Sequence, residues 1–184
     1  MRAGPPTVII LASGRGERFI ASGGTTSKLK ALLAGKPVLE HTLDAVRASG
    51  LPWHLEDAGH AGMGDSIAAA VRATPDANGW LILPGDLPLV QPSSLHAVAA
   101  ALEGDAVVLP QYRSERGHPV GFPAACRTAL LQLTGANGAA PVVRAHASVR
   151  APVVLELDDA GIVTDIDTLV DLARAEHMLA QPRS

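Results

Sequence analysis

The chain has 184 residues, of which 47% are hydrophobic but only 3% aromatic, so its core has to be built from Ala, Val, Leu and Ile. A net charge of −3, from 15 basic and 18 acidic residues, argues against binding to nucleic acid or to an anionic membrane. The single cysteine, Cys126, excludes an internal disulfide and suits a reducing compartment.

The apolar run near the N-terminus spans residues 7–12, which is far too short for a signal sequence or a membrane-spanning helix. We interpret this run as a buried strand. We therefore expect a soluble, cytoplasmic protein with one domain over residues 1–184 and a frayed tail from about residue 180.

Strand and helix patterns alternate along the chain. Short apolar or alternating segments predict extended chain at 8–11, 80–83, 106–109, 118–122, 153–157 and 162–166. Helical patterns occupy 37–49, 65–73, 123–133 and 139–146, and further helices begin near Pro92 and Thr168. Gly50 ends the first of these helices, and Thr168–Asp171 has the sequence of a capping box. This alternation predicts an α/β domain with a mainly parallel sheet.

The loop after the first strand has the composition of an anion-binding site. In such a sheet, ligands bind beyond the carboxyl ends of the strands. The small residues of Leu11-Ala12-Ser13-Gly14 would let backbone N–H groups approach a ligand closely. Arg18 adds a fork of donors suited to phosphate. A flexible surface turn would have the same composition.

Two well-known phosphate-binding motifs do not fit this region. The dinucleotide fingerprint needs a small residue where Phe19 stands, and a Walker A loop needs Gly where Ser27 precedes Lys28. Lys28 is one of three lysines within nine residues, which is typical of a solvated face. Together with Arg18, however, Lys28 would suit a clamp for a triphosphate.

Asp86 follows the second buried strand directly, between Pro84 and Pro88, at the ligand edge of the predicted sheet. Mg²⁺ is usually held by one or two carboxylates together with substrate phosphates, although an Asx-turn would explain the same residue. Asp165 or Asp167, just before the last helix, would complete the metal site. Alternatively, Asp167 only favours the helix N-terminus.

Several short motifs follow one another between Val8 and Ala175. They are Leu11–Gly14 with Arg18, Lys28–Leu29, Gly35–Leu39, Gly62–Ile67, Gly85–Pro88, Gly117–Val120 and Asp165–Thr168. Together they resemble the MobA-like nucleotidyltransferase family. The later motifs are most similar to those of the molybdenum cofactor cytidylyltransferases.

This resemblance implies a Rossmann-like three-layer domain that uses CTP and Mg²⁺. CMP would be transferred to molybdenum-bearing molybdopterin with release of pyrophosphate, and the product would pass to a molybdenum hydroxylase or its insertion chaperone. The implied nucleotide-binding residues are Leu11, Ala12, Ser13, Gly14, Arg18, Lys28, Gly62, Met63, Ser66, Pro84 and Gly85. The implied catalytic residues are Arg18, Lys28 and Asp86, the metal ligands are Asp86 and Asp167, and the acceptor-side residues are His118 and Pro119.

Three departures from the family pattern leave alternatives open. Ser13 stands where the cytidylyl enzymes have Ala and the guanylyl enzymes Gly. Ala136-Asn137 replaces an acidic residue, and the segment 50–62 is so short that we expect a strand and a helix to be absent before Gly62. The alternatives are transfer of another nucleotide or to another acceptor, such as the guanylyl branch or a sugar phosphate, and a carrier that binds the cofactor without catalysis.

Other polar or reactive residues receive structural interpretations. None of the seven histidines has the spacing of a zinc ligand. We interpret Cys126 as a packing residue, Trp53 and Trp80 as core or rim anchors, and Asp158-Asp159 as a solvated turn.

Overall fold

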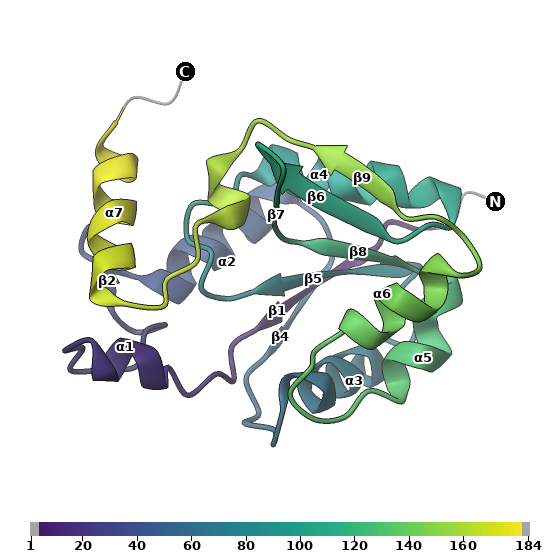
Figure 1. Cartoon of the computed structure of the whole chain (residues 1–184), viewed down its shortest axis with the longest axis horizontal. Coiled ribbons are helices and arrows are strands. Elements are labelled where there is room, and N and C mark those ends of the chain that lie inside the picture. The colour runs from purple at the N-terminus through teal and green to yellow at the C-terminus, as the bar shows by residue number, and fades with distance from the viewer. Residues whose placement is uncertain (1–3, 182–184) are drawn as a thin grey trace.

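The computed structural model describes residues 4–181, which form a mixed seven-stranded sheet flanked by helices (Figure 1). The strands are β1 (Thr7–Leu11), β4 (Trp53–Glu56), β5 (Gly79–Pro84), β6 (Val108–Tyr112), β7 (Glu115–Arg116), β8 (Val120–Pro123) and β9 (Val153–Glu156). Their order is β4-β1-β5-β8-β6-β7, with β9 paired to β6. The β4, β1 and β5 strands run parallel, as do β6 and β9, whereas β8 is antiparallel to both of its neighbours. The predicted α/β fold with a mainly parallel sheet is confirmed.

Helices cover both faces of the sheet. They are α1 (Glu17–Ala21), α2 (Val38–Ser49), α3 (Met63–Ala73), α4 (Pro92–Ala101), α5 (Arg127–Leu131), α6 (Ala140–Ala147) and α7 (Leu169–Ala180). Short 3₁₀ helices occupy Leu102–Gly104, Ala124–Cys126 and Ala160–Val163, and a separate two-stranded hairpin joins β2 (Leu32–Leu33) to β3 (Lys36–Pro37). Figure 1 shows α3, α5 and α6 together on one side of the sheet. Within residues 4–181, no helix combines the length and the apolar character that a membrane crossing requires.

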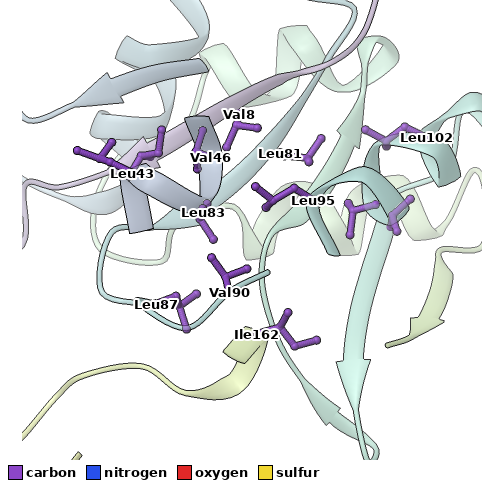
Figure 2. Close-up of a cluster of buried hydrophobic side chains, with 13 residues drawn as sticks. Val8, Leu43, Val46, Leu81, Leu83, Leu87, Val90, Leu95, Leu102 and Ile162 are labelled. Atoms are coloured by element: carbon purple, nitrogen blue, oxygen red, sulfur yellow. The ribbon is translucent and has the colours of Figure 1, made fainter. Parts of the chain in front are cut away.

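Two apolar layers hold the helices onto the sheet. On one face, Val8 and Ile10 of β1 belong to a cluster that includes Leu43 of α2 and Leu95 of α4 (Figure 2). On the other face, Ile9 belongs to a cluster with side chains of α3, α5 and α6. Successive side chains of a strand point to opposite faces, so the continuous apolar run of β1 is buried on both sides.

A third, smaller cluster lies beyond the carboxyl ends of β1 and β5. It joins Phe19 of α1, Leu33 of β2 and Ala175 of α7 to Ile166, which precedes α7. Figure 1 shows α1, β2 and α7 gathered at this end of the sheet. This packing brings the first loop and the segment before α7 together, although they are separated by most of the chain.

Several predicted boundaries are confirmed by their local chemistry. Helix α2 ends at Gly50, which has the left-handed backbone conformation (φ 68°) that glycine adopts without a steric penalty. Pro92 occupies the first turn of α4. A capping box opens α7, in which the Thr168 hydroxyl accepts from the N–H of Asp171 and the Asp171 carboxylate accepts from the N–H of Thr168. Of the predicted frayed tail, residues 182–184 lie outside the described range.

The expected absence of a strand between Gly50 and Gly62 is wrong. The β4 strand lies in this segment, parallel to β1, with Leu55 opposite Ile10. Its Trp-His-Leu-Glu sequence contains no apolar run because β4 forms one edge of the sheet and Trp53 is 42% exposed. The helix is absent as expected, because residues 57–62 lead directly into α3.

Four other predicted elements are displaced or interrupted. Helix α3 begins at Met63 rather than at Asp65 or Ser66, and the predicted strand 106–109 becomes β6 at Val108–Tyr112. The predicted strand 118–122 becomes β8 at Val120–Pro123. The predicted helix 123–133 consists of a 3₁₀ turn followed by the short α5, which ends at Leu131.

The interpretation of Asp158-Asp159 as a solvated turn is wrong for Asp159, which is only 4% exposed. Its carboxylate accepts hydrogen bonds from the Gln91 backbone N–H, the Ser94 hydroxyl and the Gly161 N–H. These bonds attach the 3₁₀ helix Ala160–Val163, which replaces the predicted extended piece 162–166, to the start of α4.

Removal of the Asp159 carboxylate should destabilise the fold. We expect Asp159→Ala to lower the free energy of unfolding by about 2–3 kcal/mol, because several buried donors lose a charged acceptor. The neighbouring Asp158 is exposed, so Asp158→Ala serves as the matched control and should change stability by less than about 0.5 kcal/mol. Urea denaturation followed by circular dichroism measures both; equal effects of the two substitutions would contradict the anchoring role.

Candidate active site

A cavity of about 260 Å³ opens at the carboxyl ends of β1 and β5. Four segments line it: the end of β1 with the loop that follows, the segment between α1 and β2, the start of α3 with the loop before it, and the end of β5. The lining residues are Leu11, Ser13, Gly14, Arg15, Lys28, Leu29, His60, Ala61, Gly62, Met63, Ser66, Pro84, Gly85 and Asp86. Most of the residues predicted to bind nucleotide are therefore neighbours in space. Ala12 and Arg18 are the exceptions, because neither lines this cavity.

The floor of the cavity is fixed by contacts between neighbouring strand ends. The Gly85 N–H donates to the carbonyl of Leu11 (2.9 Å), and its own carbonyl accepts from the buried Thr42 hydroxyl (2.8 Å). A Cβ at position 85 would lie 3.0 Å from the Leu11 oxygen, so a side chain here would push β1 and β5 apart. Ser13 and Ser66 face each other, with their hydroxyl oxygens 2.9 Å apart.

Glycines shape the wall formed by the start of α3. The Gly64 N–H donates to the carbonyl of Gly135, and the Gly135 N–H donates to the Asp65 carboxylate. A Cβ on Gly64 would lie 2.7 Å from the carbonyl oxygen of Thr134, and one on Gly62 would collide with the backbone of Gly135. These close approaches require glycine at both positions where α3 begins, two residues before the predicted cap.

An acidic cluster lies at the β5 end of the cavity. Ligand atoms of Asp86, Asp165 and Asp167 all lie within 4.8 Å of one another. The Lys28 ammonium bridges two of them, at 2.6 Å from Asp86 and 2.9 Å from Asp167. The Ile166 N–H donates to the carbonyl of Asp86, which holds the segment before α7 against the end of β5. Carboxylate oxygens in this arrangement are the ligands that Mg²⁺ and Mn²⁺ prefer.

The pKa directions show that the cluster carries excess negative charge. Burial acts to lower the pKa of Lys28, but the charges and hydrogen bonds of Asp86 and Asp167 outweigh burial and raise it. The hydrogen bond from Lys28 lowers the pKa of Asp167. Partial burial and repulsion by Asp86 and Asp167 raise the pKa of Asp165. Lys28 and Arg18 supply two positive charges against three carboxylates, so one negative charge is unbalanced and a divalent cation would offset it.

Two predicted residues have surroundings that differ from our expectation. Arg18 does not line the main cavity. Its side chain is 82% exposed, and its guanidinium lies 2.8 Å from Asp167, beside a shallow hollow on the outer side of the first loop that Lys28 also lines. Asp167 is not the cap of α7, because Thr168 supplies the cap and Asp167 instead pairs with Lys28 and Arg18. Asp167 still directly precedes the N-cap, so its charge lies near the helix N-terminus as well as beside the two cations.

The predicted acceptor-side residue His118 lies beside a second cavity of about 270 Å³, most of whose lining is apolar. This cavity shares Leu11, Met63 and Pro84 with the first, so the two hollows adjoin. Burial lowers the pKa of His118, and the charge of Asp86 offsets this in part. Asn137 also lines the second cavity, whereas Pro119 is buried and does not.

Sequence reasoning missed several residues of the main cavity, namely Arg15, Leu29, His60 and Ala61. Arg15 stands inside the predicted phosphate loop, and this position was the available signal. His60 was discounted because it lacks the spacing of a metal ligand. Its position just before the Gly62-Met63 motif was the signal that pointed to the cavity.

The sequence profile of the MobA-like NTP transferase domain matches residues 45–150, more than half of the chain. The chain belongs to this family. The bifunctional protein GlmU of Halorhodospira halophila is 35% identical to this MobA-like domain over 131 residues, which cover 59% of the chain and 26% of GlmU. The chain thus spans about a quarter of the length of the curated relatives that it matches.

Solved structures share the fold along nearly the whole MobA-like chain. Rv0371c from Mycobacterium tuberculosis H37Rv has a TM-score of 0.74 and 23% identity, covers 96% of this chain and is itself covered completely. It has also been solved in complex with manganese. A nucleotidyl transferase from Methanothermobacter, Mth528, has a TM-score of 0.79 at 20% identity, over 95% and 98% of the two chains. Molybdopterin-guanine dinucleotide biosynthesis protein A from Archaeoglobus fulgidus has a TM-score of 0.61 at 17% identity, over 95% and 98%.

The excess negative charge of the cluster of Asp86, Asp165 and Asp167 in this MobA-like domain can be tested by removing one carboxylate. We expect Asp165→Asn to raise the melting temperature at pH 7 in the absence of metal, because the folded state raises the pKa of Asp165 and so disfavours its charged form. This gain should shrink as the pH falls and vanish below about 3, where the carboxyl is protonated in both the folded and the unfolded state.

The same variant tests metal binding. Millimolar MnCl₂ or MgCl₂ should raise the melting temperature of the wild-type protein, and Asp165→Asn should lose most of this increase. Asp76 is an exposed carboxylate outside the cluster, so Asp76→Asn is the matched control and should show the same metal-dependent rise in melting temperature as the wild-type protein. An undiminished metal response in Asp165→Asn would exclude Asp165 from the site.

Proposed function

We propose that this protein is a Mg²⁺-dependent nucleotidyltransferase that transfers CMP from CTP to molybdenum-bearing molybdopterin and releases pyrophosphate. The observation that carries the proposal is the cluster of Lys28 with Asp86, Asp165 and Asp167 at one end of a cavity built from family motifs. Membership of the MobA-like family supports the reaction class.

The chain's own groups suit the electrostatics of this reaction. An oxygen of the acceptor's terminal phosphate would form a bond to the α-phosphorus of CTP, while the bond from that phosphorus to the bridging oxygen of pyrophosphate breaks. Pyrophosphate leaves with the electron pair, and no base is needed because the attacking phosphate is already anionic. Lys28, and Arg15 and Arg18 in the first loop, would offset the charge on the triphosphate and the leaving group.

The metal ligands in this proposal are Asp86 and Asp167, with Asp165 added because it lies within the same cluster. A bound Mg²⁺ would supply charge neutralisation along the triphosphate. The complex of Rv0371c with manganese supports a divalent cation in this fold. Lys28, which contacts two of these carboxylates, would then be released to contact phosphate.

The second cavity is our candidate for the acceptor. His118 lines it and Pro119 is the next residue along the chain, while Leu11, Met63 and Pro84 separate it from the nucleotide cavity. The fold is shared with the Archaeoglobus protein named for molybdopterin-guanine dinucleotide biosynthesis, which supports an acceptor of the molybdopterin type. A molybdenum hydroxylase or its insertion chaperone would then receive the product.

The same comparison also favours a second candidate, in which another base or another phosphorylated acceptor is used. A third candidate, a carrier without catalysis, rests on Ala136-Asn137 in place of a family acidic residue. Release of pyrophosphate from CTP in the presence of molybdopterin separates these possibilities. If pyrophosphate is released from GTP but not from CTP, the second candidate is favoured. If the protein binds molybdopterin but releases no pyrophosphate from either nucleotide, the carrier is favoured.

Asp86→Asn tests the metal assignment. Our sequence interpretation placed Asp86 at a solvent-facing edge, but its side chain is only 14% exposed and pairs with Lys28, so the isosteric Asn is preferable to Ala. We expect turnover to fall at least about 100-fold, equivalent to about 2.7 kcal/mol of transition-state stabilisation.

Asp44 is the matched control for this experiment, because it also pairs with a lysine at 2.6 Å but lies on the exposed face of α2. Asp44→Asn should leave turnover unchanged. If Asp86→Asn retains more than about a tenth of wild-type turnover, the metal assignment fails. Circular dichroism of both variants checks that the fold is intact.

Base choice is tested at Ser13. The Ser13 side chain occupies the cavity floor and reaches Ser66, which leaves less room for a bicyclic purine than Gly would. We expect CTP to be preferred to GTP by about tenfold or more in kcat/KM, a difference of about 1.4 kcal/mol. Ser13→Gly should lower the ratio of kcat/KM for CTP to that for GTP, and Ser13→Ala should leave this ratio unchanged. A wild-type preference for GTP, or an unchanged ratio in Ser13→Gly, would place base selection elsewhere.

A further inference from the structure

A buried carboxylate beside the nucleotide cavity holds two histidines. Glu56 ends β4, and its side chain is 7% exposed. One carboxylate oxygen lies 3.1 Å from Nε2 of His60 and accepts from the N–H of Ala58, and the other lies 3.4 Å from Nε2 of His54. Of the two histidines, His60 lines the cavity and His54 does not.

The environment of Glu56 keeps its carboxyl group ionised. Burial acts to raise its pKa, but the hydrogen bonds from Ala58, His54 and His60 outweigh burial, and the pKa is lowered. An ionised carboxylate can only accept hydrogen bonds. The Nε2 atom of His60 must therefore carry the proton that it donates to Glu56.

This hydrogen bond determines what the other ring nitrogen can do. A neutral imidazole with its proton on Nε2 has an unprotonated Nδ1, which is a hydrogen-bond acceptor. Nδ1 of His60 has no hydrogen-bond partner among residues 4–181. Because His60 also lines the cavity, Nδ1 is free to accept a hydrogen bond from a ligand bound beside it.

Sheet order places His60 at the end of the cavity opposite the acidic cluster. The β1 strand lies between β4, which carries Glu56, and β5, which ends at Asp86. Neighbouring strands are about 4.8 Å apart, so β4 and β5 are about 10 Å apart across β1. In the proposed reaction the metal and the triphosphate lie at Asp86, which leaves the β4 side for the base.

We propose that His60, oriented by Glu56, is a specificity-determining residue that selects a base carrying an exocyclic amino group, and so favours CTP over UTP. The Nδ1 acceptor would take a hydrogen bond from the 4-amino group of cytosine. Uracil presents a carbonyl oxygen at the same position, so that two acceptors would face each other. Glu56 acts as the positioning residue that holds the imidazole in this state. The inference rests on the proposed function, because it requires a nucleotide in this cavity.

Calorimetric titration with CTP and with UTP, in MgCl₂ at pH 8 without acceptor, tests the inference directly. Imidazole is ordinarily neutral at this pH. We expect the wild-type protein to bind CTP about tenfold more tightly than UTP. His60→Ala should bring the two affinities within about twofold, mainly through weaker CTP binding.

Two further variants separate base reading from general structural damage. His54→Ala removes the other histidine held by Glu56 and is the matched control; it should keep the wild-type ratio. Glu56→Gln removes the constraint on the tautomer, because an amide can donate to Nε2 as well as accept from it. Glu56→Gln should reduce the ratio of CTP affinity to UTP affinity, and it should weaken nucleotide binding as a whole less than His60→Ala does. If Glu56→Gln fails to fold, His60→Ala decides alone, since the His60 side chain is 30% exposed.

The outcomes distinguish this inference from the proposed function. If the wild-type protein binds CTP and UTP equally, or if His60→Ala keeps the wild-type ratio, the role of His60 is overturned while nucleotide binding stands. If His54→Ala reduces the ratio as much as His60→Ala does, the specific role of His60 is also overturned. If neither nucleotide binds to a folded wild-type protein in the presence of Mg²⁺, the proposed function itself fails.

Discussion

The parallel pairing of β1 with β5 is the constraint on which the rest of the site depends. Parallel strands end at the same edge of a sheet, so the first loop and Asp86 become neighbours although they are far apart in the chain. The Gly85 backbone hydrogen bond to Leu11 and its contact with Thr42 fix these two strand ends at close range.

Charge is distributed unevenly along this edge. On the β5 side, three carboxylates face two cations, the half-buried Lys28 and the exposed Arg18, so the cluster has excess negative charge that a bound cation would offset. On the β4 side, the single carboxylate of Glu56 accepts hydrogen bonds from two histidines and a backbone N–H, so its hydrogen-bonding capacity is met by the protein itself. The two ends of the cavity therefore differ chemically: one suits a metal with phosphates, and the other suits a neutral ring with polar edges.

The segment before α7 shows how packing delivers distant residues to the site. Asp159 attaches the 3₁₀ helix Ala160–Val163 to the start of α4, and Ile166 packs with Phe19 of α1. At the second of these anchors, the backbone N–H of Ile166 donates to the carbonyl of Asp86. Asp165 and Asp167 flank this contact, so both carboxylates are held at the end of β5.

The sequence by itself determined the elements whose signals are local. The continuous apolar runs of β1 and β5, Gly50 at the end of α2, and the capping box at Thr168 depend only on neighbouring residues, and the predicted α/β class followed from such patterns. The MobA-like family was indicated by the order of short motifs along the chain. The first loop and Asp86 could be assigned to one edge because the carboxyl ends of parallel strands meet there.

Only the tertiary structure decided which side chains share charge and which are buried. The β4 strand lacks an apolar run because it is an edge strand, and Asp159 looks like a surface turn residue until the donors of α4 surround it. The environment of His60 depends on Glu56, whose burial results from pairing of β4 with β1. Such effects depend on groups that are distant in sequence, and burial and Coulomb interactions act through space rather than along the chain.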